Sequence, residues 1–183
     1  MRRSVLAAMV AAGLFMGGLG AAAQAHVVIA DATARPASYF AAFFRVGHGC
    51  NGSPTISITI HIPEGVTMAK PQPKPGWTYT VATAGPDSAP DASHEAGHHN
   101  HGASHGVQPV RVTAITWNGH LKDSEFDEFG VLMKLPAGTG PLYFPTIQRC
   151  EEGELHWTQI PVAGQKWHDV PHPAPVLNLM AAP

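Results

Sequence analysis

The sequence has few charged residues and no motif for nucleotide chemistry. Only 13% of its 183 residues are Asp, Glu, Lys or Arg, and the formal net charge is −2 with neutral histidines. Nucleic-acid-binding domains normally present a basic face, so this composition argues against nucleic acid as a partner. A glycine-rich phosphate loop and a nucleophile elbow are also lacking, which argues against nucleotide, hydrolase or transferase chemistry. We therefore expect a protein that is not an enzyme.

Only one apolar stretch is long, and it lies at the N-terminus. Arg2 and Arg3 precede the apolar residues 5–16, and Ala23-Gln24-Ala25 follows as a cleavage site of the A-x-A type. Glycines keep the stretch below the roughly 20 residues of a membrane-spanning helix, which is the alternative. We expect residues 1–25 to be a helical signal peptide that is removed, and the protein to be periplasmic or secreted. The remaining 158 residues (183 less 25) would form a single domain, residues 26–183.

Stretches with helical periodicity are nearly absent, whereas proline (17) and glycine (19) are frequent. The clearest strand is residues 55–62, where four isoleucines alternate with Thr, Ser, Thr and His. Residues 70–76 contain three prolines and are expected to form an extended crossover. This pattern predicts an all-β fold, a two-sheet β-sandwich of the immunoglobulin-like or cupredoxin-like type. About nine strands are expected, at residues 27–30, 38–46, 55–62, 77–83, 110–117, 126–135, 142–148, 155–161 and 175–179.

Cysteine occurs only twice, as Cys50 and Cys150. Export would bring both into an oxidising compartment, where a disulfide is the usual state of a cysteine pair. Closing a loop of this length stabilises a fold by about 4–5 kcal/mol in the chain-entropy description. The alternative is a cysteine-ligated metal site of the blue-copper kind. We expect the disulfide.

The cleavage site has a chemical consequence, because His26 would become the first residue of the mature chain. A free α-amine and an imidazole on one residue form a chelate, and both are available as neutral ligands near neutral pH. Nitrogen donors in a tetragonal plane suit Cu(II), which also binds most tightly among the divalent first-row metals. The alternative is a histidine that follows the cleavage site by chance. We expect a metal site at His26.

Such a chelate leaves coordination positions open, and the acidic segment 124–130 offers carboxylates. Alternation at this strand start puts Glu128 on one face with Phe126, and Asp127 on the other with Phe129. Glu125 lies just before the strand. A carboxylate here is a candidate oxygen ligand, although acidic clusters of this kind are ordinarily solvated turns.

Several motifs in this order resemble the YcnI-like family of exported copper-binding domains, and the resemblance covers residues 26 to about 179. They are Ala25-His26-Val27, Ile62-Pro63-Glu64-Gly65-Val66, Lys74-Pro75-Gly76-Trp77 and Phe126-Asp127-Glu128-Phe129. Three further segments resemble its cysteine-bearing branch: Gly49-Cys50-Asn51-Gly52, Cys150-Glu151-Glu152-Gly153 and His172-Pro173-Ala174-Pro175.

The resemblance implies a β-sandwich that binds Cu(II) through a single-histidine brace. It carries the histidine over to His26 and the glutamate to Glu128, with Glu125 as the alternative. It carries a tryptophan adjacent to the metal over to Trp157, while the other tryptophans are assigned to the core. The implied function is a periplasmic copper chaperone or carrier in copper homeostasis. Its expected partners are the copper ion and another periplasmic copper chaperone or a membrane copper transporter.

Residues 85–106 differ in composition from the rest and are expected to be a mobile surface insertion. Short histidine-rich tracts are typical of metal binding, so we expect a secondary metal site that could pass copper to His26, the alternative being a solvated spacer. Its candidate ligands are His94, His98, His99, His101 and His105. Histidines elsewhere, including His48 and His172, have no spacing that distinguishes them.

Two other functions are compatible with the sequence. One is a copper-dependent oxidase resembling lytic polysaccharide monooxygenases, whose sites also begin with a metal-binding histidine but need a second histidine. Nothing in the sequence singles out that second histidine. The other is a structural or interaction domain in which the histidines have no metal-binding role.

Overall fold

The computed structural model describes residues 26–85 and 110–181, so the expected signal peptide and most of the histidine-rich insertion lie outside the described residues. The described chain is all-β, as the sequence predicts, with a single 3-10 turn, η1 (Trp167–Asp169). The strands are β1 (Val28–Ile29), β2 (Thr33–Ala34), β3 (Tyr39–Val46), β4 (Thr55–His61), β5 (Met68–Pro71), β6 (Thr78–Ala84), β7 (Arg111–Leu121), β8 (Asp127–Lys134), β9 (Gly140–Tyr143), β10 (Thr146–Cys150), β11 (Glu154–Trp157) and β12 (Val176–Leu179).

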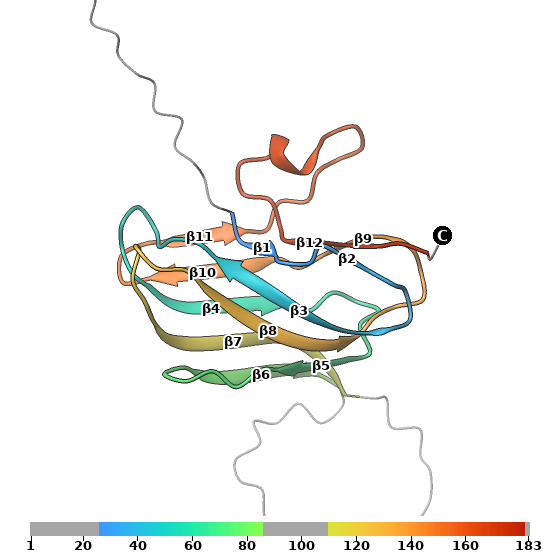
Figure 1. Cartoon of the computed structure of the whole chain (residues 1–183), viewed down its shortest axis with the longest axis horizontal. Coiled ribbons are helices and arrows are strands. Elements are labelled where there is room, and N and C mark those ends of the chain that lie inside the picture. Colours follow the sequence, from blue (N-terminus) through green and yellow to red (C-terminus); the bar gives the residue numbers. More distant parts are fainter. Residues whose placement is uncertain (1–25, 86–109, 182–183) are drawn as a thin grey trace, which may run out of the picture.

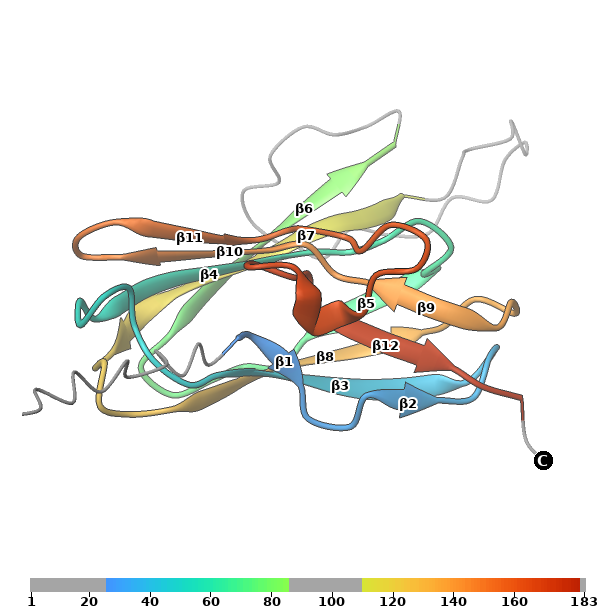
Figure 2. The same ribbon diagram turned by 90° about the horizontal axis from the view of Figure 1, so that it is seen from above.

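Two main sheets face each other, and a smaller sheet lies at one side. The first has the order β1-β3-β8-β5, and the second has the order β11-β10-β4-β7-β6. Figure 2 shows the two as layers, with β3 and β8 below β10 and β4. The third sheet has the order β2-β12-β9, and its β2 and β12 run parallel. The predicted two-sheet sandwich is therefore confirmed, with an additional small sheet.

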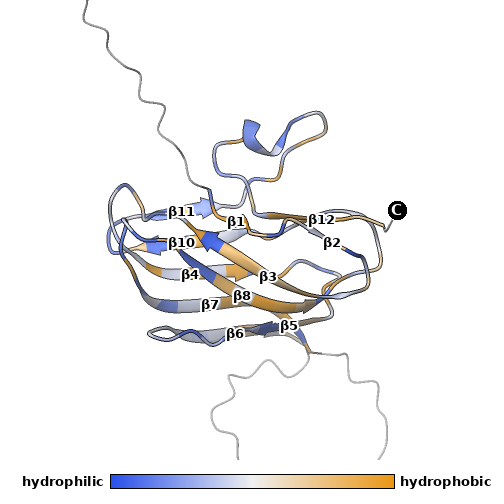
Figure 3. Ribbon diagram, in the orientation of Figure 1, coloured by the Kyte–Doolittle hydropathy of each residue, from blue (hydrophilic) through white to orange (hydrophobic). Residues whose placement is uncertain are grey.

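Side chains from both main sheets fill the space between them. The alternation in β4 buries Ile58 and Ile60 completely, and that in β3 buries Phe44. Phe44 meets Phe144 edge-on, with ring centroids 5.3 Å apart. Figure 3 shows hydrophobic stretches along β3 and β8, whereas the η1 turn is hydrophilic. No helix in the described ranges is long and apolar enough to cross a membrane.

Three differences account for twelve strands in place of the predicted nine. The short strands β2 and β5 were not expected, and β5 includes the start of the predicted crossover. Pro71 can be part of β5 because β5 is an edge strand that pairs only with β8, and proline is tolerated at the edge of a sheet. The predicted strand 142–148 is also divided: β9 joins the small sheet and β10 the second sheet, with Pro145 between them. Proline has no amide hydrogen for a ladder, so pairing changes partner there.

A long connection leaves β11 and returns to β12, carrying η1 on the way. Figure 1 shows this segment, residues 158–175, projecting from the sandwich beside the beginning of β1. The outgoing and returning arms of the segment are joined by backbone hydrogen bonds. Gln159 N donates to His172 O at 3.0 Å, and Ala174 N donates to Gln159 O at 2.8 Å. The segment leads into β12, which pairs with β2 near the start of the described residues.

Candidate metal centre

His26 lies at the start of β1, between two indole rings. Its ring centroid is 5.6 Å from that of Trp157 and 5.2 Å from that of Trp167, both in edge-on geometry. The side chain is half-buried. Two residues further, β1 pairs with β3, and Val27 between them is buried in the core. The sheet and the core thus hold His26 in place, in agreement with the strand predicted at residues 27–30.

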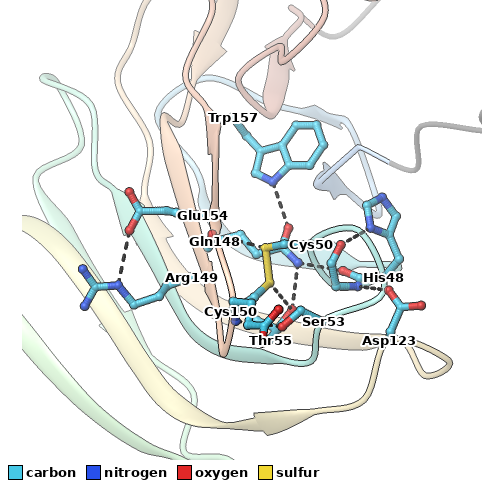
Figure 4. Close-up of a disulfide and its surroundings, with 12 residues drawn as sticks. His48, Cys50, Ser53, Thr55, Asp123, Gln148, Arg149, Cys150, Glu154 and Trp157 are labelled. Atoms are coloured by element: carbon cyan, nitrogen blue, oxygen red, sulfur yellow. Dashed lines mark hydrogen bonds and ion pairs between the residues drawn. A yellow bond between two sulfur atoms is a disulfide. The ribbon is translucent and has the colours of Figure 1, made fainter.

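Trp157 is 1% exposed and is fixed by a buried amide. Its Nε1 donates to Gln148 Oε1 at 3.0 Å, and Gln148 Nε2 in turn donates to the backbone carbonyl of His48 at 2.6 Å. The same amide nitrogen reaches Thr55 Oγ1 at 2.8 Å. Figure 4 shows this chain of contacts from the indole through Gln148 to the His48 loop. A fully paired buried network of this kind gives the indole one defined orientation.

The disulfide between Cys50 and Cys150 is present, with an S–S distance of 2.03 Å, so this prediction is confirmed. Cys50 comes two residues after His48, and Cys150 comes two residues after Gln148. The bond therefore fastens the His48 loop to β10 next to the Gln148 network (Figure 4). Asp123 adds a second attachment, because its Oδ1 accepts a hydrogen bond from Gly49 N at 2.9 Å.

Two further histidines contact the same indole. The ring centroid of His172 is 5.3 Å from that of Trp157, and the ring centroid of His48 is 6.4 Å from it. Sequence reasoning missed both, because they lie in loops 124 residues apart and neither spacing nor alternation connects them. The only signals in the sequence were their neighbours, Cys50 for His48 and the proline-rich ending for His172.

The surroundings of His26 lower its pKa below the ordinary value. Desolvation by burial is the largest cause, and the nearby His172 and His48 lower the pKa further through charge repulsion. A hydrogen bond from the His26 ring to the backbone carbonyl of Pro171 acts in the opposite direction. The neutral imidazole is favoured, which is the form that binds a metal ion.

The predicted carboxylates are paired with basic side chains. Glu128 Oε1 accepts hydrogen bonds from Arg45 Nε at 2.9 Å and Nη2 at 2.7 Å. In the first sheet, β3 with Arg45 lies between Glu128 and β1. Glu125 pairs with Lys122 at 3.2 Å. Within residues 26–85 and 110–181, no three His, Cys, Asp or Glu side chains surround a single point closely enough to hold an ion.

The tryptophans divide differently from the prediction. Trp117 is fully buried, and Trp77 packs edge-on against Phe129 at 4.9 Å, so both are core residues as expected. Trp167 is predicted to be a core residue but is half-buried beside His26, and its Nε1 donates to Ala174 O at 2.7 Å. The cause is the 158–175 excursion, which removes Trp167 from the sandwich. The side chains around His26, namely Trp157, Trp167, His48 and His172, are called the pocket below. The five histidines of the insertion lie outside the described residues.

Residues 26–179 match the family model described as "Domain of unknown function (DUF1775)". The chain belongs to the DUF1775 family. This DUF1775 chain is also similar to a crystal structure of an uncharacterized protein from Nocardia farcinica, described as revealing an immunoglobulin-like fold. The two are 25% identical, with a TM-score of 0.63 over 86% of this chain and 99% of that one. A comparison of the DUF1775 chain with curated proteins found no match. Of the two sandwich types predicted, the immunoglobulin-like type is therefore confirmed.

Proposed function

We propose that this protein is a periplasmic copper carrier that binds Cu(II) at the mature N-terminal residue His26. The observation that carries the proposal is the position of the His26 ring, held between Trp157 and Trp167 at the residue where signal cleavage would create a free amine. A terminal histidine without a binding role would normally be solvated and poorly ordered. Here strand pairing and two indoles position it.

The chemistry of the residues fits a copper ion. The amine and the imidazole of His26 supply two nitrogen donors of the kind that Cu(II) prefers. The Pro171 carbonyl accepts a hydrogen bond from the His26 ring, which is the usual arrangement that orients a metal-binding imidazole. Trp157 and Trp167 pack edge-on against the half-buried ring and would limit access of water and oxidants to a bound ion. Limited access favours carriage of the ion over oxidative chemistry.

The family supports the same conclusion. The DUF1775 match begins at His26, and the YcnI-like proteins that the sequence resembles are DUF1775 proteins. In that resemblance, copper is held by an N-terminal histidine beside a tryptophan, and Trp157 contacts His26. The implied glutamate is the weak element, because Glu128 would have to leave Arg45 and reach across β3 to become a ligand.

The deciding experiment begins with the exported, processed protein. Its N-terminal sequence should begin at His26, and it should bind one Cu(II) in the pocket with a nitrogen-rich EPR spectrum. His26→Ala, or one additional residue in front of His26, should abolish that spectrum. His156→Ala is a matched control, because His156 is an exposed histidine paired with Glu154 in the strand that carries Trp157. Cleavage at another bond, or undiminished pocket binding in His26→Ala, would exclude the proposal.

A copper-dependent oxidase is the second candidate, and one observation favours it. Such sites need a second histidine, and His48 and His172 both lie against Trp157. The copper form of an oxidase would consume dioxygen or produce peroxide in the presence of a reductant. A carrier would release the metal to a stronger chelator or an acceptor protein without such turnover.

The histidine-rich segment is proposed as an auxiliary metal site that collects copper for His26. Its support is compositional, since five imidazoles occur within residues 94–105. Deletion of residues 91–105 should lower the copper stoichiometry while the His26 spectrum persists. Unchanged stoichiometry would exclude the auxiliary site and leave the His26 site unaffected.

A further inference from the structure

Three histidines from three separate parts of the chain meet at one indole. His26 begins β1, His48 lies in the loop between β3 and β4, and His172 lies in the returning arm of the 158–175 segment. Their ring centroids lie 5.6, 6.4 and 5.3 Å from that of Trp157, respectively. Each of the two loop histidines is also near enough to His26 to act on its charge. The Trp157 indole is thus the centre of a cluster of imidazoles.

We propose that His48 and His172 supply the remaining ligands of the copper ion at His26, so that one amine and three imidazoles hold the metal. The inference rests on the proposed function, because it names the ligands of that same site. It replaces the glutamate implied by resemblance with two residues that the fold brings to the pocket.

His172 has an unused nitrogen donor inside the protein. Its Nδ1 is buried and has no hydrogen-bond partner among the residues that the structure describes. An unpaired buried polar atom is unfavourable and rare, and a bound metal ion would provide the missing partner. Gln159 holds the backbone of His172 through two hydrogen bonds. Gln159 N donates to His172 O at 3.0 Å, and the Gln159 side-chain oxygen accepts from His172 N at 2.8 Å.

His48 is oriented with one nitrogen available. Its Nδ1 lies against the carbonyl oxygen of Gly49, and because a carbonyl only accepts, Nδ1 carries the hydrogen of this contact. The neutral ring then has its lone pair on Nε2, the arrangement found in metal-binding histidines whose other nitrogen donates to a carbonyl. Gln148, Asp123 and the disulfide hold the surrounding loop in place.

Two events would complete the site. Signal cleavage would create an α-amine on the same residue as the His26 imidazole, and a rearrangement of the side chains around Trp157 would bring the free ring nitrogens to one point. Neutral imidazoles suit Cu(II) and Zn(II), whereas carboxylate sites suit harder ions. The set therefore selects for late transition metals.

Pulsed EPR on the unmodified mature protein tests the ligand set without any substitution. The remote nitrogen of each copper-bound imidazole gives a characteristic modulation, and combination lines appear only when more than one imidazole is bound. Spectra are recorded at one Cu(II) per chain, for the wild type and for the chain without residues 91–105. Combination lines in both are expected. A single imidazole at the His26 site, with oxygen as the remaining donor, would overturn the proposal.

Substitutions test the proposed roles of His48 and His172 separately. His48→Ala and His172→Ala should each weaken Cu(II) binding at least about tenfold, the lower end of what even indirect partners of metal sites contribute. His156→Ala serves as the control, and apo-state thermal unfolding checks that each variant folds. If either variant binds copper like the control, the three-imidazole set is wrong, while loss in His26→Ala alone would still support the proposed function. If the wild type binds no copper in the pocket, both proposals fail.

Discussion

Gln148 is a buried polar residue whose amide joins the pocket to the core. It is 1% exposed, and its oxygen accepts from Trp157 while its nitrogen donates to His48 O and to Thr55. Every polar atom of the side chain is thereby used. Removing it would leave buried partners without hydrogen bonds, which costs more than the net value of the bonds themselves.

Gln148→Leu should therefore destabilise the fold by about 1–3 kcal/mol for each buried partner left unpaired. It should also weaken copper binding, because the Trp157 ring and the His48 loop lose their common anchor. Urea unfolding of the apo protein and a copper competition titration measure the two effects. Arg149→Gln, at the exposed neighbouring position, is the control and should change neither by much. Equal stability of the two variants would contradict the anchoring role.

At this scale the sequence predicted some of the pocket. The predicted cleavage site pointed to His26, the number of cysteines to the disulfide, and the family resemblance to Trp157, which contacts His26. His48, His172 and Trp167 were not predictable, because their roles arise only from tertiary contacts between loops. Hydrophobic periodicity of two or 3.6 residues indicates strands and helices, but it does not indicate which residues a loop will contact in the folded protein.

Single elements were predicted where alternation is strong. β3 and β4 follow the alternating residues closely because each buries one face against the core. The division of residues 142–148 between two sheets was not predicted, since an alternating pattern does not specify which strand is the partner. Prolines at 71 and 145 are the local signals that mark the edge strand and the change of sheet.

Substitution of Glu128 tests whether the first sheet contributes a metal ligand. Its ion pair with Arg45 lies on a partly exposed face, where such pairs contribute about 0–1 kcal/mol. Glu128→Gln should change the free energy of unfolding by no more than that, and it should change the Cu(II) dissociation constant less than about twofold. Arg45→Gln is the matched variant on the other side of the pair. A loss of tenfold or more in Glu128→Gln alone would restore the carboxylate as a ligand.

The packing of Trp77, which precedes β6, on the neighbouring strand β7 depends on a glycine. A Cβ at Gly119 would lie 2.3–2.8 Å from ring atoms of Trp77, which packs against Phe129. Gly119→Ala should therefore cost about 1–3 kcal/mol, the usual range for overpacking. Gly138→Ala is the control, because a Cβ there meets nothing within 4 Å. Urea unfolding that shows the same stability for both variants would contradict this packing.

For the whole molecule, the disulfide has two roles. It closes a loop of 100 residues in the chain, and it fastens the His48 loop to β10. The first role restricts the unfolded chain, and the second shapes the pocket. A single covalent bond thus connects global stability with the geometry of the candidate metal centre.

Cys50→Ser together with Cys150→Ser should lower the free energy of unfolding by about 4–5 kcal/mol in the chain-entropy description. Copper binding should weaken as well, measured at low temperature where the variant remains folded. His48→Ala in the serine background separates the roles: its additional effect on copper should be smaller than in the disulfide-bonded protein. An undiminished effect would show that the disulfide does not position His48.

The parallel pairing of β2 with β12 joins the two ends of the domain, and it implies an order of assembly. His26 and His172 are 146 residues apart in the chain, yet both contact Trp157. A ribosome makes the N-terminal part first, and long-range contacts form late. His26 is synthesised long before His172, so the contacts around Trp157 form only when almost the entire chain is available. A truncated or still emerging chain would therefore lack the complete set of ligands that we propose.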